Sequence, residues 1–265
     1  MSKANNRYVQ LLETIFFKYF KKGKTEIPFV REDLETTATE LEIKLPKNLG
    51  DVVYTFRYRS KIPDSIARLA PPGFEWVIRP MGQAKYAFSL STMPRFIPNI
   101  LLSETKIPDS TPRVIERYAF NGEQGLLTKL RYNRLIDIFL GMACYSLQNH
   151  LRTTVPGMGQ IETDEIYIGL DKQGVHYVIP VQAKGGKDQL GTVQIEQDFA
   201  MCQYKFPSLV CIPIAAQFME DDLIALFSFE HSDKGISILC EKHYRLVEAK
   251  DLSDEELLKY KKRID

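Results

Sequence analysis

The sequence predicts an α/β protein of two domains, and three patterns support this prediction. Apolar residues repeat at helical spacing over the first 60 residues, whereas residues 74–90 contain two strand-like runs. Further along, two consecutive strand-like segments carry acids on the first and a glutamine and a lysine on the second. A helical segment and a nearly continuous apolar run follow, which is typical of a central mixed sheet flanked by helices.

Composition limits the class of protein. The 265 residues include 44% hydrophobic and 26% charged residues, as expected for a globular protein with a full core. The four cysteines are far apart without a Cys-x-x-Cys pair, which disfavours a zinc ribbon or a disulfide scaffold. No segment approaches the roughly 18 apolar residues of a membrane span. We therefore expect a cytoplasmic protein without a membrane partner.

The N-terminal domain is expected over residues 1–95. It should contain helices over residues 8–20, 31–41 and 46–59, and strands over residues 74–78 and 85–90. Helices followed by a two-stranded ribbon resemble a winged-helix module, in which a helix enters a DNA groove and the ribbon touches the backbone. This resemblance predicts a DNA-binding domain.

Charge is distributed unevenly along the chain. Residues 1–95 hold 16 Lys and Arg against 10 Asp and Glu, a net of +6, and the remainder has a net of −5. A basic surface suits a phosphate backbone, although charge alone favours the interpretation that both parts are simply solvated surfaces. The candidate phosphate contacts in this domain are Arg57, Arg59 and Lys61 at the end of the third helix, and Arg79 and Lys85 at the ribbon tip.

A connection is expected over residues 96–121, because four prolines interrupt residues 91–115. Residues 122–152 contain no proline and have a broad apolar face, so we expect a long helix or two helices broken near Gly141. His150 and Arg152 at the end of this segment are candidate phosphate contacts. Cys144, in the middle of the same segment, is expected to be buried and inert.

The acidic strand and its successor form the most informative segment. Glu162 and Asp164 alternate on one strand, and Gln182 and Lys184 alternate on the next, so each pair shares one face. A short turn at residues 170–174 favours an antiparallel hairpin. The four polar side chains are therefore expected to converge.

Further elements follow the hairpin. We expect a helix over residues 189–204, a buried strand over 210–218 interrupted at Pro213, strands over 223–229 and 236–240, and a helix over 253–263. Ser253 and Glu256 have the spacing of a capping box at the start of this last helix.

The hairpin residues suit hydrolysis of a phosphodiester with Mg²⁺, which prefers oxygen ligands. Asp164 is the leading ligand candidate, followed by the Gln182 amide oxygen and the backbone carbonyl of Ala183. Glu162 would bind the metal directly or through water, and Glu165 is the reserve if a bulge reverses the faces. Lys184 would position water or stabilise developing negative charge.

The same segment resembles the PD-(D/E)xK, or restriction-endonuclease-like, nuclease superfamily over roughly residues 122–220. Gly159 to Ile166 resembles its Glu-x-Asp strand, and Val181-Gln182-Ala183-Lys184 is similar to the Gln-Ala-Lys variant of Mrr-like endonucleases. Residues 193–198 resemble the helix after that motif, where Lys187 and Gln197 are candidate DNA contacts. Gln182 departs from the usual carboxylate, which removes one negative charge from the metal site.

This resemblance implies a Mg²⁺-dependent DNA endonuclease, with Mn²⁺ as an alternative ion, in a restriction or defence system. Cleavage of both strands of double-stranded DNA would favour a homodimer. Two alternatives stay open: a catalytically inactive DNA-binding regulator that retains the fold, and a structure-specific repair nuclease.

Overall fold

The structure is a computed structural model that describes residues 3–118, 122–185, 188, 190–220, 223–233 and 235–263, with the side chains of residues 3–6, 58 and 59 outside that description. Contacts divide the chain into two compact units. The first unit comprises Met1–Phe96, Arg152–Glu162 and Gln189–Tyr204, and the second comprises Ile97–Leu151, Thr163–Asp188 and Lys205–Asp265. The first break therefore falls close to residue 95, but the first unit also includes two later segments.

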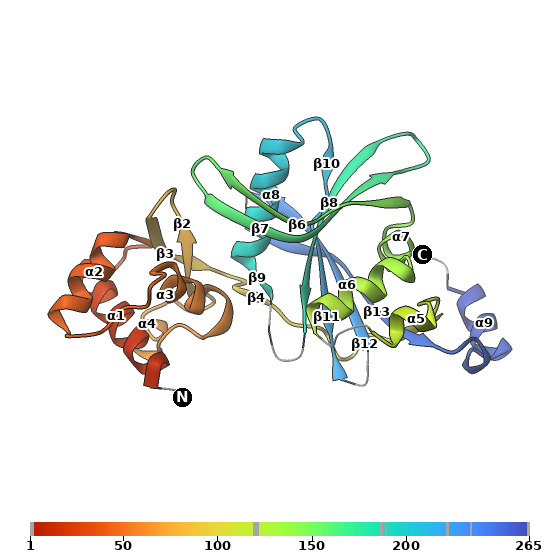
Figure 1. Cartoon of the computed structure of the whole chain (residues 1–265), viewed down its shortest axis with the longest axis horizontal. Helices are drawn as coiled ribbons and strands as arrows, with labels where there is room; N and C mark the ends of the chain where they lie inside the picture. The colour runs from red at the N-terminus through yellow and green to blue at the C-terminus, as the bar shows by residue number, and fades with distance from the viewer. Residues whose placement is uncertain are drawn as a thin grey trace. The chain divides into compact units, whose positions relative to one another are not determined.

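The first unit contains helices around a small antiparallel sheet (Figure 1). Its helical elements are α1 (Lys3–Tyr19), α2 (Arg31–Glu40), α3 (Gly50–Tyr54), the π-helix η1 (Thr55–Arg59), α4 (Asp64–Ala67) and α8 (Thr192–Lys205, to Tyr204 in this unit). Its sheet has the order β1 (Glu26–Val30), β3 (Lys85–Ser91), β2 (Glu75–Pro80). The short strands β4 (Arg95–Phe96) and β9 (Leu190–Gly191) pair separately.

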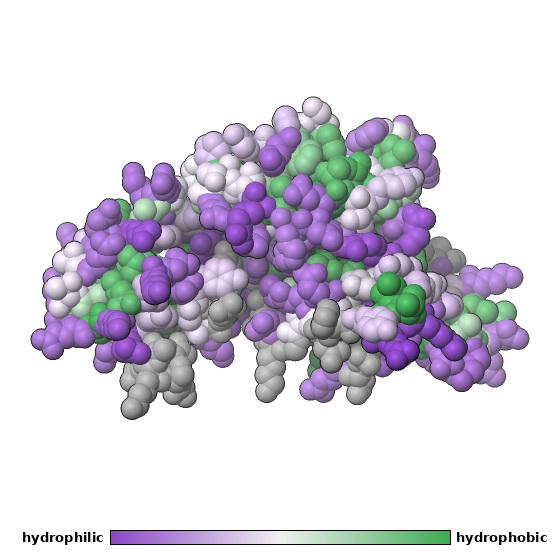
Figure 2. Space-filling model, in the orientation of Figure 1, coloured by the Kyte–Doolittle hydropathy of each residue, from purple (hydrophilic) through white to green (hydrophobic). Residues whose placement is uncertain are grey.

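Aromatic packing forms the core of the first unit. The Phe16 ring on α1 meets the Trp76 ring at 5.3 Å and the Phe88 ring at 5.1 Å, both edge to face. Such pairs add to the stabilisation from apolar burial. Hydrophilic residues cover much of the visible surface of this unit, with smaller apolar areas between them (Figure 2).

The second unit is built on a large mixed sheet, which confirms the α/β class. The strands follow the order β5 (Glu104–Pro108), β13 (Gly235–Val247), β12 (Leu223–Ser232), β11 (Ile214–Phe218), β8 (His176–Lys184), β7 (Gly159–Leu170), β6 (Ala143–Val155), and β10 (Val210–Cys211) also pairs with β8. Strand β8 is parallel to β11 and antiparallel to β7. The interruption expected at Pro213 separates β10 from β11.

Helices flank this sheet. They are α5 (Arg113–Glu116), α6 (Glu123–Tyr132), α7 (Leu135–Leu140), the 3₁₀ turn η3 (Ala249–Asp251) and α9 (Asp254–Lys261). Helix α6 packs on β8 and β11, and its Leu127 and Leu130 join Val181 and Ala183 of β8 in the core. The predicted capping box is confirmed, since the Ser253 hydroxyl accepts the Glu256 amide at 3.3 Å at the start of α9.

The long helix predicted up to residue 152 is wrong beyond Leu140. Gly141 adopts a left-handed conformation with φ +66°, which ends α7, and strand β6 begins at Ala143. Residues 145–150 of β6 are all exposed, so this strand has no two-residue burial period. His150 and Arg152 consequently lie on a strand and not at a helix end. Pairing with the next strand, β7, decided this region against its local helical pattern.

Besides β6 and the two-residue strands β4 and β9, two further strands were not anticipated. Strand β1 pairs with β3 in the first unit, and β5 pairs in parallel with β13 in the second unit. Each has five residues and contains a proline, Pro28 in β1 and Pro108 in β5. Their sequences therefore carry a weak local strand signal, and their pairing depends on partners far along the chain.

Candidate active site on the β7–β8 hairpin

The expected hairpin is present. Strands β7 and β8 pair antiparallel from Glu165 opposite Val181 to Leu170 opposite His176. In the turn, the Asp171 carboxylate accepts the amides of Gln173 and Val175, both at 2.9 Å, and Gly174 takes φ +80°. The turn thus fixes the register that brings the acidic strand beside the glutamine-lysine strand.

Asp164 lies beside the last pair of this register. Its Oδ2 accepts the backbone N–H of Ala183 at 2.8 Å, which joins the acid to β8. Burial raises the pKa of Asp164, while the Ala183 amide and Lys184 lower it and Glu123 raises it further. The carboxylate is therefore held in a poorly solvated place next to both a cation and a second acid.

Lys184 brings that second acid into the site. Its Nζ donates to Oε1 of Glu123 at 2.9 Å, and the two side chains are 14% and 40% exposed. Glu123 stands in the first turn of α6, immediately after Gly122, which has φ +94°. A Cβ atom at Gly185 would lie 3.2 Å from the Gly122 Cα, so glycine permits this close approach between the end of β8 and the start of α6.

Glu123 is the site residue that the sequence prediction missed. An acid in the first turn of a helix is common because it complements the helix dipole. Nothing in its local sequence distinguishes it from that ordinary role. Only the packing of α6 on β8 brings its carboxylate to Lys184.

His150 faces the same group of residues from β6. Its Nε2 lies 3.0 Å from the Gln124 amide nitrogen, and its charge acts on Asp164 to lower that residue's pKa. The His150 backbone has φ +47°, a conformation that non-glycine residues adopt infrequently and that clusters at functional sites. The exposed imidazole therefore stands beside the hairpin acids, although on a strand and not on the predicted helix.

Gln182 and Ala183 lie on β8 with different environments. The Gln182 side chain is 3% exposed and alternates with Lys184 on the same strand face. Ala183 is fully buried in the core under α6, and its N–H is the group that binds Asp164. A metal-binding role for its carbonyl oxygen stays a prediction.

Glu165 has a different partner from Asp164. Its Oε1 accepts Nε and Nη2 of Arg131 at 3.1 and 2.9 Å, and it also accepts the Ser146 hydroxyl at 2.5 Å. The Glu165 side chain is fully buried. Adjacent residues of a strand point to opposite faces, so Glu165 faces away from the side of β7 on which Asp164 lies. The pair of Glu165 with Arg131 joins β7 to α6.

Glu162 belongs to the first unit and pairs with Arg152 there. The Arg152 Nη2 atom donates to both carboxylate oxygens, at 3.1 and 3.0 Å, and the side chains are 62% and 48% exposed for arginine and glutamate. An ion pair this exposed contributes little to stability. Both residues remain reachable by a phosphate or a metal ion.

The other predicted DNA contacts vary in accessibility. Lys61 and Lys85 are exposed, whereas Arg79 binds Glu196 through two nitrogens and Gln197 is buried. The Nε and Nη2 atoms of Arg57 are shielded from solvent, and the residue as a whole is half-buried. Lys187 and the Arg59 side chain lie outside the described residues.

Whether a divalent metal ion fits near Asp164 depends on the oxygen donors that surround it. Among the described residues, no three His, Cys, Asp or Glu side chains gather in a group that could hold a metal ion. Asp164 and Glu123 nevertheless offer carboxylate oxygens beside Lys184, and Gln182 lies two residues before Lys184 on β8. Such a set suits Mg²⁺, which keeps several waters and needs one or two carboxylates from the protein.

Comparison with protein-family models, curated proteins and solved structures returns no match for this chain. Within the described part of the chain, no helix combines the length and apolar character that crossing a membrane requires.

Proposed function

We propose that this protein is a Mg²⁺-dependent DNA endonuclease whose active site is the β7–β8 hairpin with the start of α6. The observation that carries this proposal is the arrangement of Asp164 and Lys184 on neighbouring strands, together with Glu123. From β7 onward, the order of two antiparallel strands, helix and parallel strand agrees with the order that the PD-(D/E)xK resemblance implies, although strand β6 stands between the preceding helix and β7.

Each residue has a role that follows from its surroundings. Asp164, with Glu123 and Gln182, would hold Mg²⁺, and the ion when bound supplies charge neutralisation at the phosphate and a more acidic water. The Ala183 amide orients the Asp164 carboxylate. Glu123 fixes the Lys184 ammonium at the strand end, where it can bind a phosphate oxygen. His150 is exposed beside this group and suits contact with the adjacent phosphate.

The first unit supports DNA binding. Helices precede the β2–β3 ribbon, as the winged-helix resemblance requires, and the ribbon turn carries the exposed Lys85. Lys61 is also exposed, just after η1. Residues 1–95 have a net charge of +6. This charge and the exposed Lys61 and Lys85 suit nonspecific contact with double-stranded DNA. We propose a homodimer in which each subunit cleaves one strand.

One observation favours a second candidate, a DNA-binding regulator without catalysis. Gln182 is neutral and almost fully buried, so the site has one negative charge fewer than a site with a carboxylate there. A weaker charge lowers metal affinity, and a chain that binds no metal would retain only the DNA-binding function.

Cleavage of supercoiled plasmid in Mg²⁺ separates the two candidates. The wild type, Lys184→Ala and Lys172→Ala are compared, where Lys172 is an exposed lysine in the hairpin turn and serves as the matched control. Nicking by the wild type and by Lys172→Ala, but not by Lys184→Ala, supports the endonuclease. DNA binding without cleavage by any of the three, across methylated, unmethylated and branched DNA, supports the regulator.

A further inference from the structure

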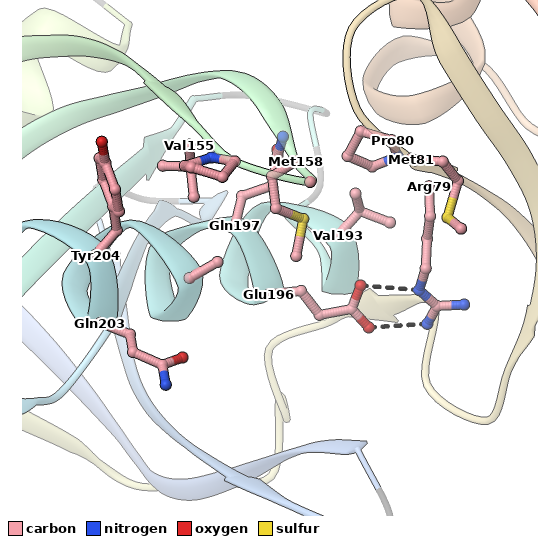
Figure 3. A pocket seen from close by; sticks show the side chains of 13 residues that line it. Arg79, Pro80, Met81, Val155, Met158, Val193, Glu196, Gln197, Gln203 and Tyr204 are labelled. Atoms are coloured by element: carbon pink, nitrogen blue, oxygen red, sulfur yellow. Dashed lines mark hydrogen bonds and ion pairs between the residues drawn. The ribbon is translucent and has the colours of Figure 1, made fainter.

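The first unit contains a pocket that is separate from the residues proposed for catalysis. It lies between the β2–β3 turn, the tip of the β6–β7 hairpin and one side of α8, and its volume is about 610 Å³ (Figure 3). Pockets of roughly 300–1,000 Å³ are the usual size for small organic ligands. The three segments that line it are far apart in sequence, so folding of this unit creates the pocket.

The walls are mainly apolar and polarisable. Met158 lies over α8 between Gln197 and Val193, with Tyr204 at one end of the pocket (Figure 3). Tyr204 and Met81 are 56% and 44% exposed, so both side chains can contact a ligand in the pocket. Aromatic rings stack on tyrosine, and thioether sulfur atoms make favourable contacts with ring edges. These side chains therefore suit a flat aromatic ligand.

The other end of the pocket is polar but has no net charge. Arg79 Nε and Nη2 each donate to one oxygen of Glu196 at 2.8 Å, and Arg79 Nη1 donates to the Leu90 carbonyl at 3.2 Å. Three of the five guanidinium N–H groups are thus used, and Glu196 neutralises the charge of Arg79, whereas each carboxylate oxygen can accept a further hydrogen bond. This end favours a neutral ligand with N–H donors over a phosphate or a carboxylate.

We propose that this pocket binds a neutral nucleobase. The base would stack on Tyr204, contact Met81 and Met158, and donate N–H groups to Glu196. Two sources present this chemistry: a base rotated out of a DNA duplex, and a free nucleoside. Binding here goes beyond the proposed cleavage at Asp164 and requires no metal.

The test follows the ¹³C-methyl NMR signals of Met81 and Met158 in the full chain without divalent metal. Three probes are added separately: 2-aminopurine riboside, a DNA duplex with one unpaired adenine, and the same duplex fully paired. The variant Ala200→Phe adds a ring inside the pocket without removing a polar group. Ala67→Phe adds the same ring at an exposed position of α4 and is the matched control.

The proposal expects saturable shifts of both methyl signals with the riboside, with the duplex containing the unpaired base, or with both. Response to the duplex alone identifies DNA as the source, and response to the riboside alone identifies a free nucleoside. Ala200→Phe should abolish these shifts and Ala67→Phe should retain them. Tyr204→Ala should weaken binding roughly tenfold, because base stacking on an aromatic side chain is lost.

Absence of shifts with every probe in the wild type would overturn the proposal, as would shifts that persist in Ala200→Phe. An equal response to the paired and unpaired duplexes, without a response to the riboside, would also contradict it. Thermal unfolding shows whether Ala200→Phe is folded, and Tyr204→Ala provides the test if it is not. Since the readout needs neither Mg²⁺ nor cleavage, its failure is distinct from failure of the nuclease proposal.

Discussion

The Lys184 ammonium lies 2.9 Å from the Glu123 carboxylate, although the two residues are 61 positions apart. A second acid-base pair, Glu165 with Arg131, connects the same helix to β7. Helix α6 is therefore joined to both strands of the hairpin, at its first turn and near its end. This arrangement makes α6 part of the candidate site, because it sets the position of Lys184 beside Asp164.

Replacing Glu123 should impair cleavage more than folding. In Glu123→Gln the carboxylate that orients Lys184 and supplies an oxygen donor is lost, while the side-chain size is kept. We expect cleavage to fall by roughly 100-fold, the scale of positioned charged groups in catalysis. Plasmid cleavage and thermal unfolding measure the two effects. Glu116→Gln, at an exposed position of α5, is the control. Equal cleavage by Glu123→Gln and Glu116→Gln would show that Glu123 takes no part in cleavage.

Asp164 should make stability depend on pH. Burial raises its pKa above the ordinary 3.8, so the native chain holds this proton more tightly than the unfolded chain does. That contribution is present at low pH and is lost as pH rises through the raised native pKa. In metal-free buffer, Asp164→Asn should therefore be more stable than wild type at neutral pH, and the difference should shrink toward pH 3.8. Urea unfolding across this range measures it; a destabilised variant at neutral pH would contradict the account.

Glu165 and Arg131 should be coupled in stability. Removing only Arg131, as in Arg131→Met, leaves the fully buried Glu165 without its cation. Breaking a buried pair costs roughly 3–5 kcal/mol, and we expect the lower end because Arg131 is 39% exposed. The double variant Arg131→Met with Glu165→Met should recover much of this loss. Urea unfolding of the single and double variants completes the cycle, and purely additive losses would show that the pair is not coupled.

Gln182 should limit metal affinity. Gln182→Glu keeps the side-chain length and adds the negative charge that most PD-(D/E)xK enzymes have there. We expect the Mg²⁺ concentration for half-maximal cleavage to fall about tenfold, equivalent to about 1.4 kcal/mol. Titration of cleavage against Mg²⁺ measures this concentration. An unchanged or higher requirement would indicate that the buried Gln182 side chain does not contribute to metal binding.

The sequence was sufficient to predict the hairpin and the strands that carry its four polar residues, including Glu162 on β7. Asp164, Gln182 and Lys184 lie on the expected strands because strand alternation and the turn at residues 170–174 are local properties. The same holds for α8 and for the capping box of α9. Local sequence patterns predict these elements, and the structure places them in a sheet flanked by helices, as expected.

Residues whose position depends on packing between elements could not be predicted in the same way. Strand β6 has exposed residues from 145 to 150, so its sequence lacks the period that would distinguish it from a helix. His150 was therefore predicted at the end of a helix, whereas it lies on strand β6 with φ +47°. Glu123 had no signal of its own, since an acid in a first helical turn is ordinary. Both residues acquire their place from the packing of α6 and β6 around the hairpin.

Direct measurement of metal binding tests the central claim that the hairpin acids hold a divalent ion. Mn²⁺ is titrated into the wild type, Asp164→Asn and the control Glu116→Gln, and free Mn²⁺ is followed by electron paramagnetic resonance. The account predicts saturable binding by the wild type and the control, and at least tenfold weaker binding by Asp164→Asn, equivalent to about 1.4 kcal/mol. Equal Mn²⁺ binding by all three proteins, or no binding by the wild type, would contradict it.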